Sequence, residues 1–223
     1  MALILSLDAT TTVCSVAIHQ DSNLIAAEFI EEPRAASSRL MVAAQDLLKK
    51  SHLKPTDLRA VAVSSGPGSY TGLRIATSAA KGICVALNIP LVAVNSLRVM
   101  ARPIIAQKLA DFYCPMIDAR RMEVYCCLFD GNGNEVSRIE AKILNSESFQ
   151  NELNQSKIAF FGDGSGKFKT VANHPNALFV DDVQPDAKDL GGLAFQKFKA
   201  GQIEDVAEFE PFYLKDFLIK SKQ

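Results

Sequence analysis

Residues 60–86 read AVAVSSGPGSYTGLRIATSAAKGICVA and combine an apolar run, a glycine-rich break and a regular apolar pattern. The run Ala60–Val63 has the composition of a strand buried on both faces. Gly66-Pro67-Gly68 can continue neither a strand nor a helix. From Tyr70 onward, small and apolar residues recur every three or four positions. The segment therefore predicts a buried strand, a tight turn and a helix.

The start of this helix has two interpretations. Ser69 or Thr71 can cap it, and unpaired N–H groups and the helix dipole then converge on the glycine turn, where they favour a phosphate. A tight strand-to-helix turn also needs glycine for its backbone alone. The turn has neither the Gly-Lys-Ser/Thr of a Walker loop nor a GxGxxG motif. Spacing alone leaves both interpretations open.

Composition limits the class of protein. The chain has 223 residues, of which 48% are hydrophobic, enough for one large domain or two small ones. The 24 basic and 25 acidic residues give a net charge of −1, which offers no electrostatic basis for binding nucleic acid alone. The apolar start has no basic lead-in and reaches Asp8 too soon for a signal peptide. No run approaches the roughly 20 apolar residues of a membrane span. We therefore expect a cytoplasmic protein.

Cysteine and histidine give no sign of metal binding or of a catalytic triad. The five cysteines form an odd set without CxxC spacing and lie in apolar runs, which predicts small buried hydrophobes. They are Cys14, Cys84, Cys114, Cys126 and Cys127. His19, His52 and His174 are far apart, and we expect each at the surface.

The predicted elements of the whole chain form two similar sets. The first set has predicted strands 3–7, 13–18, 24–30, 60–63 and 89–94, with helices 36–50, 70–87 and 96–109, and Ser37 or Ser38 as the cap of helix 36–50. The second has predicted strands 112–117, 124–129, 135–144, 158–161 and 178–180, with helices 146–153 and 187–200, and then an extended tail, 206–220.

Each set opens with an apolar strand that ends in aspartate, Asp8 or Asp118. Two copies of a βββαβα unit predict an α/β molecule of two subdomains with a cleft between them. We expect residues 1–108 and 109–223 to form these subdomains, with the tail able to pack back on the first.

Four motifs follow this order: Leu7-Asp8-Ala9-Thr10, the segment 65–74 (SGPGSYTGLR), the segment 118–125 (DARRMEVY) and Pro211-Phe212-Tyr213-Leu214. Together they resemble the TsaB (formerly YeaZ) family, the small subunit of the bacterial machinery that makes threonylcarbamoyladenosine at position 37 of tRNA. The resemblance covers essentially the whole chain. It implies an ASKHA (actin/Hsp70-like, ribonuclease H-like) fold, the catalytic paralogue TsaD and the ATPase TsaE as partners, and tRNA contact through the complex.

The resemblance implies cofactor-binding candidates at the phosphate side of the cleft, with ATP or ADP as the candidate cofactor at the complex interface. These candidates are Asp8, Thr10, Gly66, Gly68 and Arg74. Asp8 has an alternative role as a strand-end residue that accepts loop amides. The Gly162–Gly166 turn lies where ASKHA proteins hold adenosine, but a simple turn is the favoured interpretation.

In the family that the chain resembles, the catalytic paralogue holds its metal with an HxxxH pair, and the resemblance implies that the matching positions here are Ser96 and Met100. A hydroxyl and a thioether cannot form that hard-metal site. We therefore predict no catalytic residue and no metal ligand, and a scaffold or activator subunit without activity of its own. The rivals are an autonomous ATP-using phosphotransferase or ATPase and a metalloprotease.

Helices 36–50 and 71–87 are apolar over wide arcs and rich in small residues, which suits close helix packing. The resemblance implies that they pair with the paralogue, or with a second copy when the chain is isolated. The predicted interface residues are Leu40, Met41, Ala44, Leu48, Leu73, Ala76, Ala80 and Ile83. The alternative is that both helices only cover their own sheet.

Overall fold

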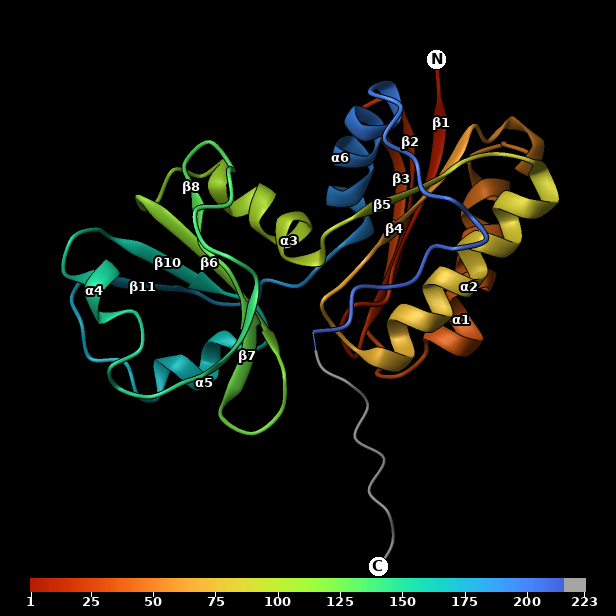
Figure 1. Ribbon diagram of the computed structural model, residues 1–223. Helices are drawn as coiled ribbons and strands as arrows, with labels where there is room; N and C mark the ends of the chain where they lie inside the picture. The colour runs from red at the N-terminus through yellow and green to blue at the C-terminus, as the bar shows by residue number, and fades with distance from the viewer. Residues whose placement is uncertain (215–223) are drawn as a thin grey trace, which may run out of the picture.

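The computed structural model describes residues 1–214, which form two β-sheets side by side (Figure 1). The first sheet has the order β3-β2-β1-β4-β5. Its strands are β1 (Leu3–Asp8), β2 (Cys14–Gln20), β3 (Asn23–Ile30), β4 (Ala60–Ser64) and β5 (Leu91–Val94). β1, β2 and β3 form the predicted antiparallel meander, and β4 and β5 continue the sheet in parallel to β1.

The second sheet repeats this arrangement in the order β11-β10-β6-β7-β9, with β8 paired to β6. Its strands are β6 (Phe112–Asp118), β7 (Glu123–Cys126), β8 (Phe129–Asp130), β9 (Glu140–Ile143), β10 (Ile158–Phe161) and β11 (Ala177–Val180). β6, β7 and β9 are antiparallel, and β10 and β11 are parallel to β6. The predicted duplication is confirmed.

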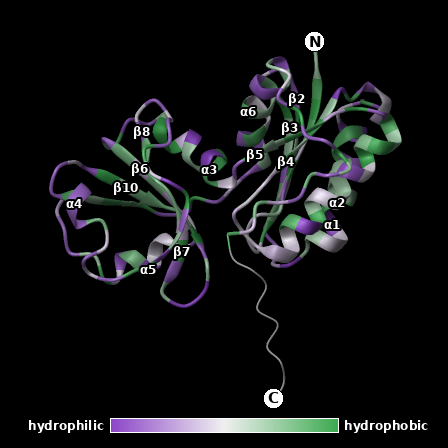
Figure 2. Ribbon diagram, in the orientation of Figure 1, coloured by the Kyte–Doolittle hydropathy of each residue, from purple (hydrophilic) through white to green (hydrophobic). Residues whose placement is uncertain are grey.

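Helices cover both faces of the first sheet. α1 (Ala36–Lys50) and α2 (Tyr70–Leu87) pack on the face of β1 that carries Leu3, Leu5 and Leu7, and α6 (Ala187–Lys199) packs on the face that carries Ile4. Figure 2 shows hydrophobic residues along the strands and mixed with hydrophilic residues on the helices. The apolar faces of the helices therefore point inward.

α3 (Ser96–Ile105), α4 (Gln150–Leu153) and α5 (Ser165–Lys169) contribute to the cores of the second sheet. We call the first sheet with α1, α2 and α6 the first lobe, and the second sheet with α3, α4 and α5 the second lobe. α3 and α6 thus each pack on the sheet of the other half of the sequence. The division into subdomains 1–108 and 109–223 stays a prediction. In it, α3 of the first part and α6 of the second part each pack on the sheet of the other part.

One predicted cap and several predicted boundaries are wrong for local reasons. α1 begins after Ala35 with no side-chain cap, because the Ser38 hydroxyl donates to the Ala35 carbonyl (3.2 Å) instead. The predicted helix 146–153 begins only at Gln150, since Asn145 and Ser148 form a turn that competes with the first helical hydrogen bonds. The predicted strand 135–144 is reduced to β9, and 124–129 splits into β7 and β8. Residues 215–220 of the predicted tail lie outside the described residues.

All five cysteines are buried and free, as predicted, but the surface position expected for His19 is wrong. His19 is 1% exposed, because α6 covers β2. Its Nε2 lies 3.0 Å from the Lys188 carbonyl oxygen. Gly191 of α6 packs directly against the imidazole, and a methyl group there would overlap the ring. Burial lowers the pKa of His19, so the folded chain holds the neutral ring.

We therefore expect the free energy of unfolding to decrease as the pH falls below about 6.5, the ordinary imidazole pKa. The unfolded chain then takes up a proton on His19 that the folded chain resists. Urea titrations at several pH values measure this slope, and His19→Gln should flatten it. A slope equally steep in the variant would show that other groups cause it.

Candidate functional site

The glycine turn joins β4 to α2 and is held from three sides. The Ser96 hydroxyl accepts from the N–H of Gly66 (3.0 Å), and the Asn95 side chain donates to the Gly66 carbonyl (3.0 Å). The Ser69 N–H donates to the Thr10 carbonyl (2.7 Å), which ties the turn to the β1–β2 loop. Ser69 is the cap of α2, since its hydroxyl accepts from the Gly72 N–H (3.3 Å). The turn is thus fixed by contacts within the chain.

Two glycines are required by close approach of this loop. A Cβ on Gly68 would lie 2.5 Å from the Thr10 carbonyl oxygen, and one on Gly72 would overlap the Ala9 carbonyl. Both positions face backbone that has little room to move. These contacts support the interpretation that the glycines serve packing, and the chain's own carbonyls occupy the space beside them.

Asp8 is the acceptor at the centre of the same region. It is 2% exposed and accepts from the Thr10 N–H and hydroxyl (each 3.0 Å) and from the Ser64 hydroxyl. The Thr10 hydroxyl also lies 3.2 Å from the Ser96 hydroxyl. Burial raises the pKa of Asp8, against these hydrogen bonds, which lower it. The arrangement matches the strand-end role weighed from the sequence, whereas contact with nucleotide remains a prediction.

Arg74, the last cofactor candidate, lies on the exposed side of α2. Its guanidinium donates to the Tyr70 hydroxyl (2.5 Å) and lies 5.0 Å from the centre of the Tyr70 ring. The Tyr70 ring in turn lies 5.0 Å from that of Tyr213. Asp8, Thr10, Gly66 and Gly68 are therefore brought together, while Arg74 is held by Tyr70.

The chain returns to this turn near its end. Glu204 donates its N–H to the Leu91 carbonyl at the edge of β5 (2.9 Å), and Phe212 donates to the Ser65 carbonyl (2.7 Å). The Lys81 ammonium donates to the carbonyls of Ala207 (2.9 Å) and Phe209 (3.1 Å). The segment 204–212 thus crosses the first lobe and closes over the glycine turn.

The equivalent corner of the second lobe differs. Asp118 also ends a strand, but it is accessible and pairs with the Lys167 ammonium (2.6 Å). Asp163, in the turn after β10, accepts from the Asp118 N–H (3.0 Å). A Cβ on Gly164 would lie 2.7 Å from the Val124 side chain, so this turn too is packed closely.

The structure buries most of the predicted interface residues, so their prediction as a surface for a partner is wrong. Six of them face the core of their own lobe and are at most 6% exposed: Leu40, Ala44, Leu48, Leu73, Ala76 and Ala80. Met41 is 44% exposed, and Ile83 is half-buried. The periodic apolar face is the one that covers the sheet, so the outward face must be defined by the residues between.

Comparison with known proteins now identifies the family. The family model described as TsaD, tRNA N6-adenosine threonylcarbamoyltransferase, matches residues 29–218. The chain is 30% identical to the tRNA threonylcarbamoyladenosine biosynthesis protein TsaB of Escherichia coli, over 96% of this chain and 94% of the relative. The chain belongs to the TsaB (YeaZ) family.

Structural comparison agrees with this assignment. YeaZ from Pseudomonas aeruginosa superposes with a TM-score of 0.82 at 27% identity, covering 96% of this chain and all of the other. The activator of 2-hydroxyisocaproyl-CoA dehydratase from Clostridium difficile, with bound ADPNP, has a TM-score of 0.53 at 13% identity and shows the fold alone. The predicted α/β ASKHA fold of this TsaB-family chain is confirmed.

Two further observations concern what the TsaB-family chain could hold. Among residues 1–214, no three His, Cys, Asp or Glu side chains are grouped so that they could hold a metal ion. Ser96 and Met100, which the resemblance matches to the paralogue's HxxxH pair, are both buried in α3. In the same described range, no helix is long and apolar enough to cross a membrane.

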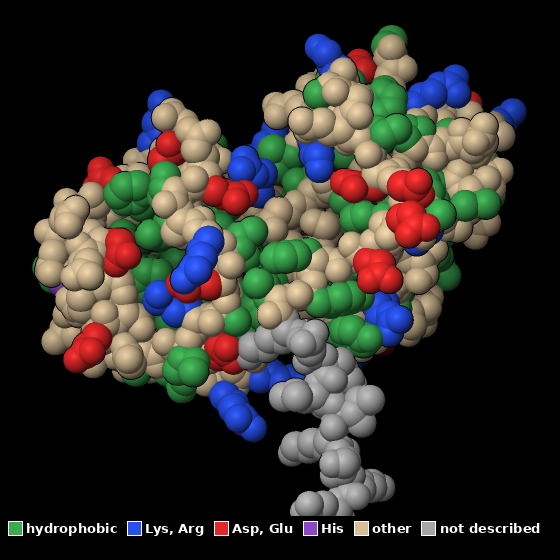
Figure 3. Space-filling view, viewed as in Figure 1, with side chains coloured by type: hydrophobic (Ala, Val, Ile, Leu, Met, Phe, Trp, Pro, Cys, Tyr) green, Lys and Arg blue, Asp and Glu red, His purple; other side chains and the backbone are tan. Residues whose placement is uncertain are grey.

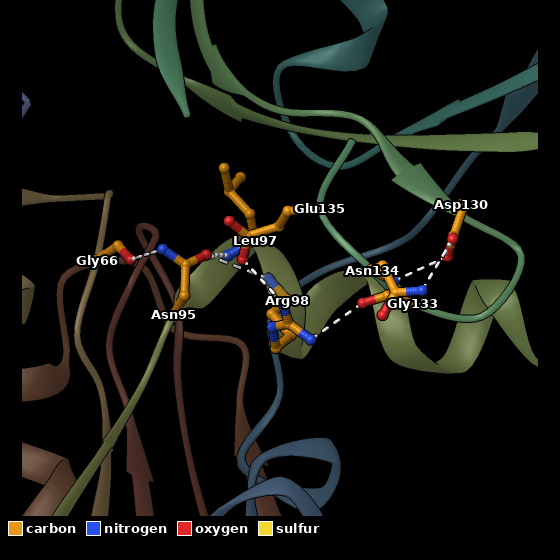
Figure 4. Close-up of polar contacts among 8 residues, drawn as sticks. All are labelled: Gly66, Asn95, Leu97, Arg98, Asp130, Gly133, Asn134 and Glu135. Atoms are coloured by element: carbon orange, nitrogen blue, oxygen red, sulfur yellow. Dashed lines mark hydrogen bonds and ion pairs between the residues drawn. The ribbon is translucent and has the colours of Figure 1, made fainter. Parts of the chain in front are cut away.

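Sequence reasoning missed the contact that joins the two lobes through α3 (Figure 4). Asn95 caps α3 by accepting from the N–H of Leu97 (2.9 Å), while its amide donates to Gly66. Arg98, one turn later, donates to the Gly133 carbonyl and to Glu135 (each 3.0 Å) in the hairpin loop of the second lobe. Asparagine before a helix is a recognisable cap signal, but the contact of Arg98 across 35 residues has no local signal.

Proposed function

We propose that the chain is a non-catalytic subunit of the machinery that forms threonylcarbamoyladenosine in tRNA, and that it activates a TsaD-type catalytic partner. The observation that carries this proposal is the similarity to TsaB along nearly the whole chain. The site adds support, because Asp8, Thr10, Ser64 and Ser96 satisfy one another inside the chain. A cytoplasmic location, where tRNA is modified, belongs to the same proposal.

The partner would bind the outward face of α1 and α2, which we define by Met41, Val42, Ser78, Gly82 and Val85. Met41, Val42 and Val85 are 44%, 48% and 73% exposed. Ser78 and Gly82 are also exposed, and a Cβ on Gly82 would meet nothing within 4 Å. The small residues let another helix approach closely, and the apolar side chains beside them would then be removed from water. A second copy of the chain would compete for the same face.

The proposed mechanism is coupling by binding. α2 begins at the glycine turn, and Asn95 and Arg98 connect this turn to the second lobe. A partner that contacts the outward face in only one of its own conformations is shifted toward that conformation. TsaE, tRNA and ATP or ADP would join at the assembled complex.

Val85→Glu tests this surface. Burying an unpaired carboxylate against a partner should weaken binding about tenfold to one hundredfold. Titration calorimetry with the catalytic paralogue measures the affinity, and a tRNA modification assay with the reconstituted machinery measures activation. Ile143→Glu is the matched control, because Ile143 is 72% exposed on β9 of the second lobe.

Both variants should retain the parent melting temperature, since neither side chain is buried. Equal affinity of Val85→Glu and the parent chain would remove the outward face from the proposal. Modification at the full rate without this chain would remove the proposed function itself.

A further inference from the structure

A cavity of about 390 Å³ lies where the two lobes meet, away from the outward face of α1 and α2. The end of β5, the first turn of α3, the last two turns of α6 and Gln202 form its walls. Val94 and Leu193 give it apolar lining, and polar side chains surround them. The volume falls within the range of small-molecule pockets, about 300–1,000 Å³.

The charged residues that line the cavity are both basic. Arg98 enters from α3 and Lys197 from α6. Their acidic partners, Glu135 and Glu204, do not line it. Figure 3 shows basic and acidic side chains gathered over α3 and the neighbouring part of α6 on this face. A ligand inside the cavity therefore contacts two cations, each of which also has a carboxylate partner at 3.0 Å (Arg98) or 3.7 Å (Lys197).

Both cations are held in place, yet Lys197 retains hydrogen-bonding capacity. Arg98 is fixed by Gly133 and Glu135 of the second lobe. The Lys197 ammonium donates to the Ala93 carbonyl (2.6 Å) and lies 3.7 Å from Glu204, too far for a hydrogen bond. An ammonium has three N–H donors. Among the described residues only one of them makes a hydrogen bond, so two remain for a ligand.

The rim offers amide groups as well. Gln196 and Gln202 line the cavity, and within residues 1–214 neither side chain makes a hydrogen bond. Each amide can both donate and accept, which suits the uncharged polar part of a small metabolite.

We propose that this cavity binds a small organic anion, whose carboxylate or phosphate is held by Lys197 and Arg98 and whose uncharged part lies on Val94 and Leu193. Charge-assisted hydrogen bonds to the anion supply the specificity, and the apolar lining supplies contact area. Because Asn95 and Arg98 also line the cavity, the bound anion would touch the residues that connect the glycine turn to the second lobe.

The test uses the full chain and three probes: adenosine 5′-monophosphate for a phosphate, succinate for a carboxylate, and uncharged adenosine. We expect at least one of the two anions to shift the amide NMR signals of Asn95, Gln196 and Gln202. If the phosphate is the recognised group, adenosine should bind at least tenfold more weakly than adenosine 5′-monophosphate. Which anion binds distinguishes the two sources of negative charge.

Lys197→Gln should weaken anion binding about tenfold or more, since it removes a charge-assisted hydrogen bond. Lys199→Gln, an exposed lysine in the same last turn that does not line the cavity, should leave binding unchanged. Gln196→Trp, at an exposed position on the rim, provides a second variant that fills the cavity without altering a buried group.

The proposal is overturned if neither anion shifts these signals at about 10 mM, a concentration that detects even millimolar affinity. It is also overturned if both Lys197→Gln and Gln196→Trp bind the anion as tightly as the parent, or if Lys199→Gln weakens binding as much as Lys197→Gln does.

Discussion

Gly72→Ala should lower the free energy of unfolding by about 3 kcal/mol, at the upper end of the cost of overpacking a close contact. A single added methyl group would overlap the Ala9 carbonyl, which belongs to the loop after β1. Neither side can yield easily, because Ser69 and Thr10 hold the loop and the helix start together (2.7 Å). Guanidinium denaturation monitored by circular dichroism measures the loss.

Gly82→Ala is the matched control in the same helix. A Cβ there meets nothing within 4 Å, so the substitution should stabilise the chain by about 0.5–1 kcal/mol through helix propensity alone. If Gly72→Ala were as harmless as Gly82→Ala, α2 would not be seated on the β1–β2 loop as described.

Asp8→Ala should cost about 3 kcal/mol, because it leaves buried donors without an acceptor and opens a small cavity. The Thr10 N–H cannot turn to another partner, whereas the hydroxyls of Thr10 and Ser64 can rotate. Asp8→Asn should therefore cost much less, since its carbonyl accepts from the N–H and its amide donates to the hydroxyls. Thermal and chemical denaturation of the two variants give the comparison.

Asp8→Asn also separates the two roles weighed for this residue. If Asp8 is a strand-end acceptor, the folded Asn variant should support tRNA modification by the reconstituted machinery at close to the parent rate. ATP hydrolysis by the isolated parent chain that disappears in a folded Asp8→Asn variant would instead support the autonomous ATPase.

The sequence predicts the elements of the fold well where local chemistry is strong. The Gly-Pro-Gly break after four apolar residues predicts β4, the turn and α2, and the periodicity of residues 36–50 predicts α1 to the residue. The repeated order of elements, with Asp8 and Asp118 at equivalent strand ends, predicts the duplicated sheets. These signals are local, so a single sequence contains them.

The site is predicted less well because it depends on contacts between distant segments. Apolar periodicity identifies the face of α2 that covers the sheet, and Ala76 and Ala80 belong to that face rather than to a partner. The burial of His19 requires α6, which lies about 170 residues later in the chain. Arg98 and Lys197 approach one cavity from different helices, and nothing near either residue indicates the other.

The exchange of α3 and α6 between the lobes has a consequence for synthesis. While the ribosome is still translating the second half, α6 is not available, and the side chains of Ile4, Val92 and Val94 that it covers face solvent. We therefore expect the nascent amino-terminal half to be an incomplete folding unit, exposed to aggregation until residue 199 has left the ribosome. Chaperones that recognise apolar strands would act during this interval, and a product truncated before α6 would remain dependent on them.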